Sequence, residues 1–98
     1  MKQTPAKSLQ TELFKALLVL KTPEECQKFF VDLCTPAELI ALAERWRVAQ
    51  LVEQEIPYRK INELTGVSTA TITRVARSLD YGSGGYRLAL DRVKTKQK

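Results

Sequence analysis

Hydroxyl groups and arginines gather in one short stretch of the sequence, STATITRVAR, which runs from Ser68 to Arg77. Hydroxyls can bond base edges or phosphates, threonine methyls can touch the methyl group of thymine, and guanidinium groups can neutralise phosphates or bind guanine. These residue types suit noncovalent recognition of nucleic acid. They do not suit catalysis, because the chain has no histidine, no paired carboxylates at a plausible site and no metal-ligand spacing. We expect no enzyme activity, no cofactor and no metal.

A helix-turn-helix over residues 58–77 would position these side chains. Gly66 supplies the turn, where one position favours a positive φ, and Ser68 caps a helix that runs from Thr69 to about Leu79. With Ile72 turned inward, the helical period directs the small and charged residues outward. The predicted contacts with double-stranded DNA, two of them on the preceding helix, are Arg59, Lys60, Ser68, Thr69, Ala70, Thr71, Thr73, Arg74 and Arg77.

Helical patterns cover the rest of the chain, and no run alternates as a strand does. Thr22-Pro23 and Thr35-Pro36, each followed by a glutamate in the position of a capping box, predict two helix starts. A long helix from Pro36 to about Glu53 and a last helix after the loop 82–85 complete an all-α fold of about six helices. The residues expected inward are Phe29, Phe30, Leu33, Leu39, Leu42, Trp46, Ala49, with Ala43 and Leu51 alongside, and Ile61, Val67, Ile72, Val75, Ala76, Leu79, Tyr86, Leu90 and Val93.

The length and the charge of the chain limit the classes of partner that it can bind. The chain has 98 residues, enough for one domain with a modest core that a dimer would enlarge. The net charge is +5, but residues 22–56 hold three basic and seven acidic residues, whereas residues 57–98 hold nine basic and three acidic ones. An anionic polymer would therefore dock on the C-terminal half. Lys94, Lys96 and Lys98 lie in a basic end segment that we expect to fray.

Cysteine usage and hydropathy indicate the compartment. Cys26 and Cys34 lie eight residues apart without a CxxC motif, which is typical neither of a disulfide framework nor of a zinc site. We expect reduced thiols in a cytoplasmic protein. No apolar run approaches the length of a membrane span, and the N-terminus lacks a signal sequence, so we expect no membrane partner.

The motif STATITRVARSL, preceded by LCTPAELIALAERWRVAQLV, resembles the Trp repressor family, and most closely its YerC/YecD branch. The resemblance implies an intertwined homodimer that presents two helix-turn-helix heads to an operator. It implies a single domain over residues 1–98, with dimerisation helices at about 5–54 and 85–95 and a DNA-reading head at 57–79. The implied function is that of a sequence-specific transcriptional regulator, such as a repressor. The alternative is a protein-interaction module that uses the same helices, with an incidental basic face.

The resemblance also implies a ligand pocket, in which two arginines sandwich the indole of tryptophan. Arg45 and Arg74 match these arginines, and Thr35 and Ser78 match polar positions around the amino acid. The repressor has a glycine directly after its recognition-helix arginine, whereas this chain has Val75, which fills the space that a ring would need. We therefore expect that tryptophan is not the effector, while another small-molecule effector stays possible.

Without a ligand, the two arginines have simpler roles. Arg45 would pair with Glu44, Glu38 or another surface acid, and Arg74 would neutralise a phosphate. Tyr58 and Asn62 match groove-facing positions where the repressor carries different polar groups, so the operator sequence should not transfer.

Overall fold

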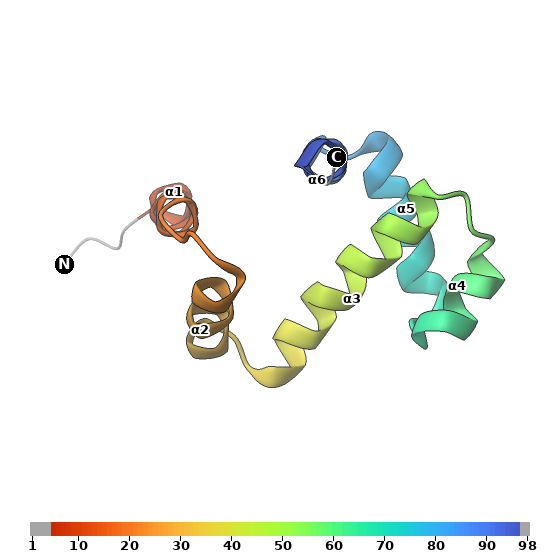
Figure 1. Cartoon of the computed structure of the whole chain (residues 1–98), viewed down its shortest axis with the longest axis horizontal. Helices are drawn as coiled ribbons and strands as arrows, with labels where there is room; N and C mark the ends of the chain where they lie inside the picture. Colours follow the sequence, from red (N-terminus) through yellow and green to blue (C-terminus); the bar gives the residue numbers. More distant parts are fainter. Residues whose placement is uncertain (1–4, 97–98) are drawn as a thin grey trace. The chain divides into compact units, whose positions relative to one another are not determined.

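The computed structural model describes residues 5–96, with side chains as far as Thr95. These residues form six α-helices and no β-strand, which confirms the predicted all-α fold. In chain order the helices are α1 (Ala6–Leu18), α2 (Pro23–Leu33), α3 (Pro36–Glu53), α4 (Tyr58–Thr65), α5 (Thr69–Tyr81) and α6 (Gly85–Lys96), as Figure 1 shows. The chain divides into two compact units, Met1–Leu39 and Ile40–Lys98.

The helix starts of the first unit follow the predicted caps. The Thr22 hydroxyl oxygen accepts a hydrogen bond from the N–H of Glu25 at 3.1 Å, and that of Thr35 accepts one from the N–H of Glu38 at 3.2 Å. Glu38 completes a capping box by accepting the N–H of Thr35 at 2.8 Å, and this bond lowers the pKa of Glu38. Glu25 instead accepts the N–H of Lys21 at 2.8 Å, one residue before its expected partner.

The first unit has apolar side chains but no core of its own. Neither α1 nor α2 buries a residue in the single chain. The rings of Phe29 and Phe30 meet edge to face with centroids 5.9 Å apart, and both are half-buried. The prediction that Leu33 points into a core is wrong for the single chain, because no other part of this unit covers it and its side chain is exposed. Leu18 is also exposed.

The core of the second unit forms where the C-terminal half of α3 meets α4 and α5 (Figure 1). Trp46 and Tyr86 are partly buried against this core. The inward residues predicted for the helix-turn-helix are all confirmed, because each is at most 9% exposed. The buried cluster consists of Val48, Ala49, Leu51, Ile61, Val67, Ile72 and Val75.

The helix α3 buries a different line of residues from the predicted one. Ala49 and Leu51 are buried, as predicted, but Leu42 and Ala43 are exposed, and Val48 is buried although it was not predicted to be. Apolar residues occur on several sides of α3, from Ile40 to Leu51. The helical period therefore does not define one inward face, and contact with α4 and α5 selects it.

The helix α6 follows the three-residue link Gly82–Gly84 and packs on α5. Leu90 is buried and Tyr86 is half-buried, as predicted, whereas the prediction that Val93 points inward is wrong, because its side chain is exposed. The helix α6 continues to Lys96 and so includes the first three residues of the segment that we expect to fray. Lys98 lies outside the described residues.

Candidate nucleic-acid interface

A glycine elbow joins α4 to α5. Gly66 ends α4 with φ 74° and ψ 0°, the left-handed conformation predicted for it. The side-chain amide of Asn62 donates to the carbonyl of Val67 at 2.8 Å, and the Thr65 hydroxyl donates to the carbonyl of Ile61 at 2.7 Å. The sequence predicted that Asn62 faces the groove, and it predicted no role for Thr65. The structure instead uses both side chains to fix the turn.

The start of α5 is capped by Ser68, as predicted. Its hydroxyl oxygen accepts the N–H of Thr71 at 3.2 Å and donates to the hydroxyl oxygen of Thr71 at 3.1 Å. One side of α5 is sealed in the core, where Ile72 is 0% and Val75 1% exposed. The cap and this buried side fix which residues of α5 face solvent.

Six residues lie together on the exposed side of α5, and we call them the α5 stripe. Together with Gly82 they line an open hollow of about 460 Å³. Neither Arg74 nor Arg77 forms an ion pair within the described part of the chain, so both guanidinium groups are available to a partner. The α5 stripe consists of Ala70, Thr73, Arg74, Arg77, Ser78 and Tyr81.

Tyr81 extends this surface beyond the predicted set. It is the last residue of α5 and is 86% exposed. The predicted helix end at about Leu79 left Tyr81 out of consideration. The spacing of residues 70, 74, 77 and 81 could have revealed it, because the same helical face continues for one more turn.

Thr71 lies on a different side of α5 from Thr73. It is half-buried and lines a hollow of about 250 Å³ with Ser68, Arg45 and Glu44. The expected pairing of Arg45 with an acid is wrong: Arg45 makes no ion pair among the described residues. Glu38, one proposed partner, instead accepts a hydrogen bond from the backbone N–H of Thr35.

The predicted basic residues of α4 are exposed. Arg59 carries no ion pair in the part of the chain that the structure describes, whereas Lys60 lies 3.8 Å from the carboxylate of Glu63. Both partners of this pair are 58% exposed, so the attraction is weak and Lys60 can exchange Glu63 for another anion.

Three of the four positions implied for a tryptophan pocket line hollows within the described part of the second unit. Arg74 and Ser78 line the hollow along α5, and Arg45 lines the separate hollow beside Thr71. Thr35 belongs to the first unit, where it caps α3.

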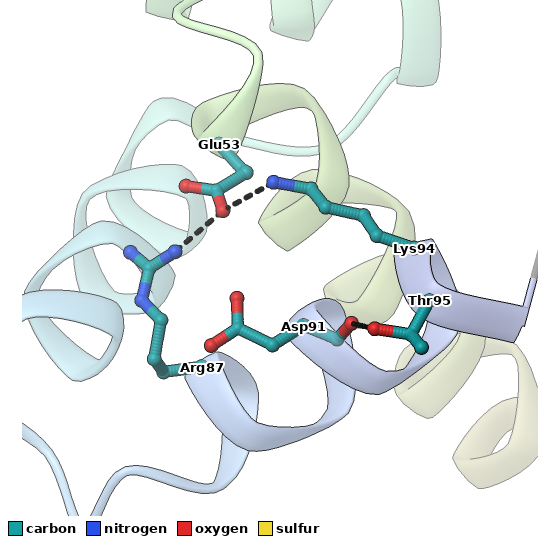
Figure 2. Close-up of polar contacts among 5 residues, drawn as sticks. All are labelled: Glu53, Arg87, Asp91, Lys94 and Thr95. Atoms are coloured by element: carbon teal, nitrogen blue, oxygen red, sulfur yellow. Dashed lines mark hydrogen bonds and ion pairs between the residues drawn. The ribbon is translucent and has the colours of Figure 1, made fainter. Parts of the chain in front are cut away.

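A cluster that the sequence reading missed joins α3 to α6, as Figure 2 shows. The carboxylate of Glu53 accepts hydrogen bonds from Arg87 and from Lys94, the latter at 3.0 Å. These two bonds lower the pKa of Glu53 to about 2. Lys94 is 61% exposed, as expected for a solvated end segment, but its pairing with Glu53 was not predicted. Separations of 34 and 41 residues left no local signal of the cluster.

His, Cys, Asp and Glu form no group that could hold a metal ion between residues 5 and 95. Cys26 and Cys34 are free and half-buried. No helix within 5–96 combines the length and apolar character of a membrane span.

The chain is similar to known proteins over most of its length. The sequence model of the family described as Trp repressor protein matches residues 8–94. The uncharacterised protein YerC of Bacillus subtilis (strain 168) is 52% identical over 83 residues, which are 85% of this chain and 80% of YerC.

Two solved structures agree with this match. The crystal structure of a candidate Trp repressor from Staphylococcus aureus has a TM-score of 0.85 and 45% identity, over 89% of this chain and 87% of that one. A TrpR-like protein from Eubacterium eligens ATCC 27750 has a TM-score of 0.82 and 44% identity, over 86% and 87% of the two chains. The chain therefore belongs to the Trp repressor family, in the branch that includes YerC.

Proposed function

We propose that this protein is a sequence-specific, DNA-binding transcriptional regulator of the cytoplasm that acts as a homodimer and has no catalytic activity. The helix-turn-helix at residues 58–77 would carry the DNA contacts. The proposal rests on the α5 stripe, which exposes two arginines that form no ion pair with the described residues, on a helix whose opposite side is buried in the core. Membership of the Trp repressor family supports the same function.

The contacts divide by position along α5. Thr69, Ala70 and Thr73 are exposed near the N-terminal end, where short side chains allow close approach to base edges in the major groove. Arg74 and Arg77 lie further along the same face and would neutralise phosphates or bind guanine.

The remaining predicted contacts have supporting roles. Arg59 and Lys60 on α4 would bind backbone phosphates. Ser68 and Thr71 would act mainly through the helix cap that they share, because each uses its hydroxyl there.

A second copy of the chain would supply the missing core. The proposed domain spans residues 1–98, with a DNA-reading head at 57–79 between dimerisation helices at about 5–54 and 85–95. Support comes from α1 and α2, which bury no residue in the single chain and expose Leu9, Phe14, Leu18, Val31 and Leu33. Water-exposed apolar area of this kind is stabilised by burial against a partner.

Selection of bound duplexes from a random library, followed by affinity measurements at several salt concentrations, tests the proposal. Four basic residues per head, Arg59, Lys60, Arg74 and Arg77, make eight per dimer, and predict a slope of log K against log salt of about −7. Arg74→Ala should reduce this slope by about two, because each dimer loses two phosphate contacts. The matched control is Arg92→Ala, which removes an exposed arginine of α6 that has no ion pair among the described residues, and it should leave the slope unchanged.

Two results would contradict the proposal. One is the absence of any enriched sequence, which would favour the protein-interaction module. The other is a slope near zero on an enriched duplex, because binding through phosphates must release counterions.

We propose further that tryptophan is not the effector. Val75 is 1% exposed and packs in the buried cluster, so its side chain occupies space that a ring would need. Calorimetry of the unaltered protein with tryptophan should show no binding, and any measurable heat of binding would contradict this proposal. Val75→Gly should restore binding if the side chain alone blocks the pocket.

A further inference from the structure

We infer that Glu53 is a positioning residue for DNA binding: it holds α6 in one orientation on the end of α3 and thereby sets the separation of the two reading heads in the dimer. This inference rests on the proposed function, because it requires two heads on one duplex.

The contact geometry supports a fixed orientation. Figure 2 shows the Glu53 side chain at the end of α3, reaching toward Arg87 and Lys94 on α6. Both cations bond the same carboxylate oxygen. They lie seven residues apart, so they share one face of α6 and span about 10 Å along its axis. A single carboxylate that binds two points this far apart restricts both the tilt and the rotation of α6.

Apolar contacts alone do not provide this restriction. On α6, Leu90 is buried and Tyr86 is half-buried against the core, whereas Leu88 is exposed. Tyr86 and Leu90 define one line along the helix, about which α6 could rock. Arg87 and Lys94 lie roughly 70° around the helix from that line, by the 3.6-residue period. The Glu53 bonds therefore act to one side of the apolar contact and oppose rocking.

The Glu53 carboxylate is also shielded from solvent. Its side chain is 17% exposed, compared with 43% for Arg87 and 61% for Lys94. Partial burial makes the attraction between Glu53 and its two cations stronger than that of a fully exposed ion pair. Arg87 and Lys94 both bind this one carboxylate.

The cluster joins the helices that flank the reading head. The end of α3 packs on α4 and α5, and α6 follows α5 after only Gly82–Gly84. In the proposed dimer, α3 and α6 both contact the second copy, so their mutual orientation sets the distance between heads. Half-sites lie one helical turn of DNA apart, roughly 34 Å, and both heads fit only if that distance is held.

The experiment compares two duplexes. One carries both half-sites of a sequence selected with the unaltered protein, and the other carries a single half-site. We expect Glu53→Gln to weaken binding to the two-half-site duplex roughly tenfold, with single-half-site affinity unchanged within about twofold, because each head keeps its own contacts. Arg87→Gln should act similarly. The matched control is Glu55→Gln, an equal charge change at an exposed position without an ion pair among the described residues, and it should change neither affinity.

Circular dichroism and solution mass would accompany each variant. If Glu53→Gln fails to fold, Lys94→Gln removes only one of the two bonds and should show a smaller loss of the same selective kind. Equal losses on both duplexes, or no loss on either, would overturn the inference about Glu53. If the unaltered protein binds no duplex at all, the proposed function itself fails, and that result is distinct from the other two.

Discussion

Replacing Gly66 with alanine tests the elbow between α4 and α5 quantitatively. At φ 74° Gly66 adopts a left-handed conformation, which costs an L-residue about 1 kcal/mol. A Cβ atom built at this position meets no atom within 4 Å, so the substitution adds backbone strain without a steric clash. We therefore expect Gly66→Ala to lower the free energy of unfolding by about 1 kcal/mol.

Urea unfolding followed by circular dichroism, at one fixed protein concentration, measures this change. Gly66→Asn should lose less stability, because asparagine tolerates the left-handed conformation. Gly85→Ala is the matched control: Gly85 begins α6 without a positive φ, and its added Cβ would lie 4.0 Å from the nearest atom, so stability should hold or rise slightly. An unchanged free energy of unfolding for Gly66→Ala, or a loss above about 3 kcal/mol, would show that backbone strain at Gly66 is not the cause.

Three other perturbations have calculable effects. Gly82→Ala places a Cβ 2.4 Å from the backbone carbonyl oxygen of Ser78, so urea unfolding should show a larger loss than for Gly66→Ala, about 2 kcal/mol or more. Glu55 has φ 62° at the end of α3, so Glu55→Gly should raise the free energy of unfolding by up to about 1 kcal/mol, and a decrease would contradict this. The pKa of Glu53 is lowered from 4.5 to about 2 in the folded protein, so its stabilisation is complete above pH 4.5 and is lost as the pH falls toward 2. The stability difference between unaltered protein and Glu53→Gln, about 1 kcal/mol at neutral pH after allowance for solvent screening, should therefore shrink over that range. A difference that stays constant between pH 5 and pH 2 would be inconsistent with this pairing.

Local patterns predicted the helix-turn-helix well. The cap at Ser68, the left-handed Gly66 and the inward side chain of Ile72 all depend on residues within a few positions of one another. Such features follow from the helical period and from capping chemistry, so sequence alone defines them.

The missed features depend on contacts that no short pattern encodes. Glu53 finds its partners on α6, and the buried line of α3 is selected by α4 and α5. In sequence, Asn62 could face either a groove or its own turn. It faces the turn because the folded backbone brings the carbonyl of Val67 within hydrogen-bonding distance of its side chain. Leu33 of α2 is recognisable in sequence as an inward residue, yet it is exposed, because α2 buries no residue in the described part of the single chain.

A chemical-shift titration of isotope-labelled protein with a selected duplex tests whether α5 contacts DNA. If it does, the largest changes should fall on the amides of residues 68–74 and on the guanidinium signals of Arg74 and Arg77, while the amide of Leu90 moves little. Changes centred on α6, with the signals of the α5 stripe unmoved, would contradict it.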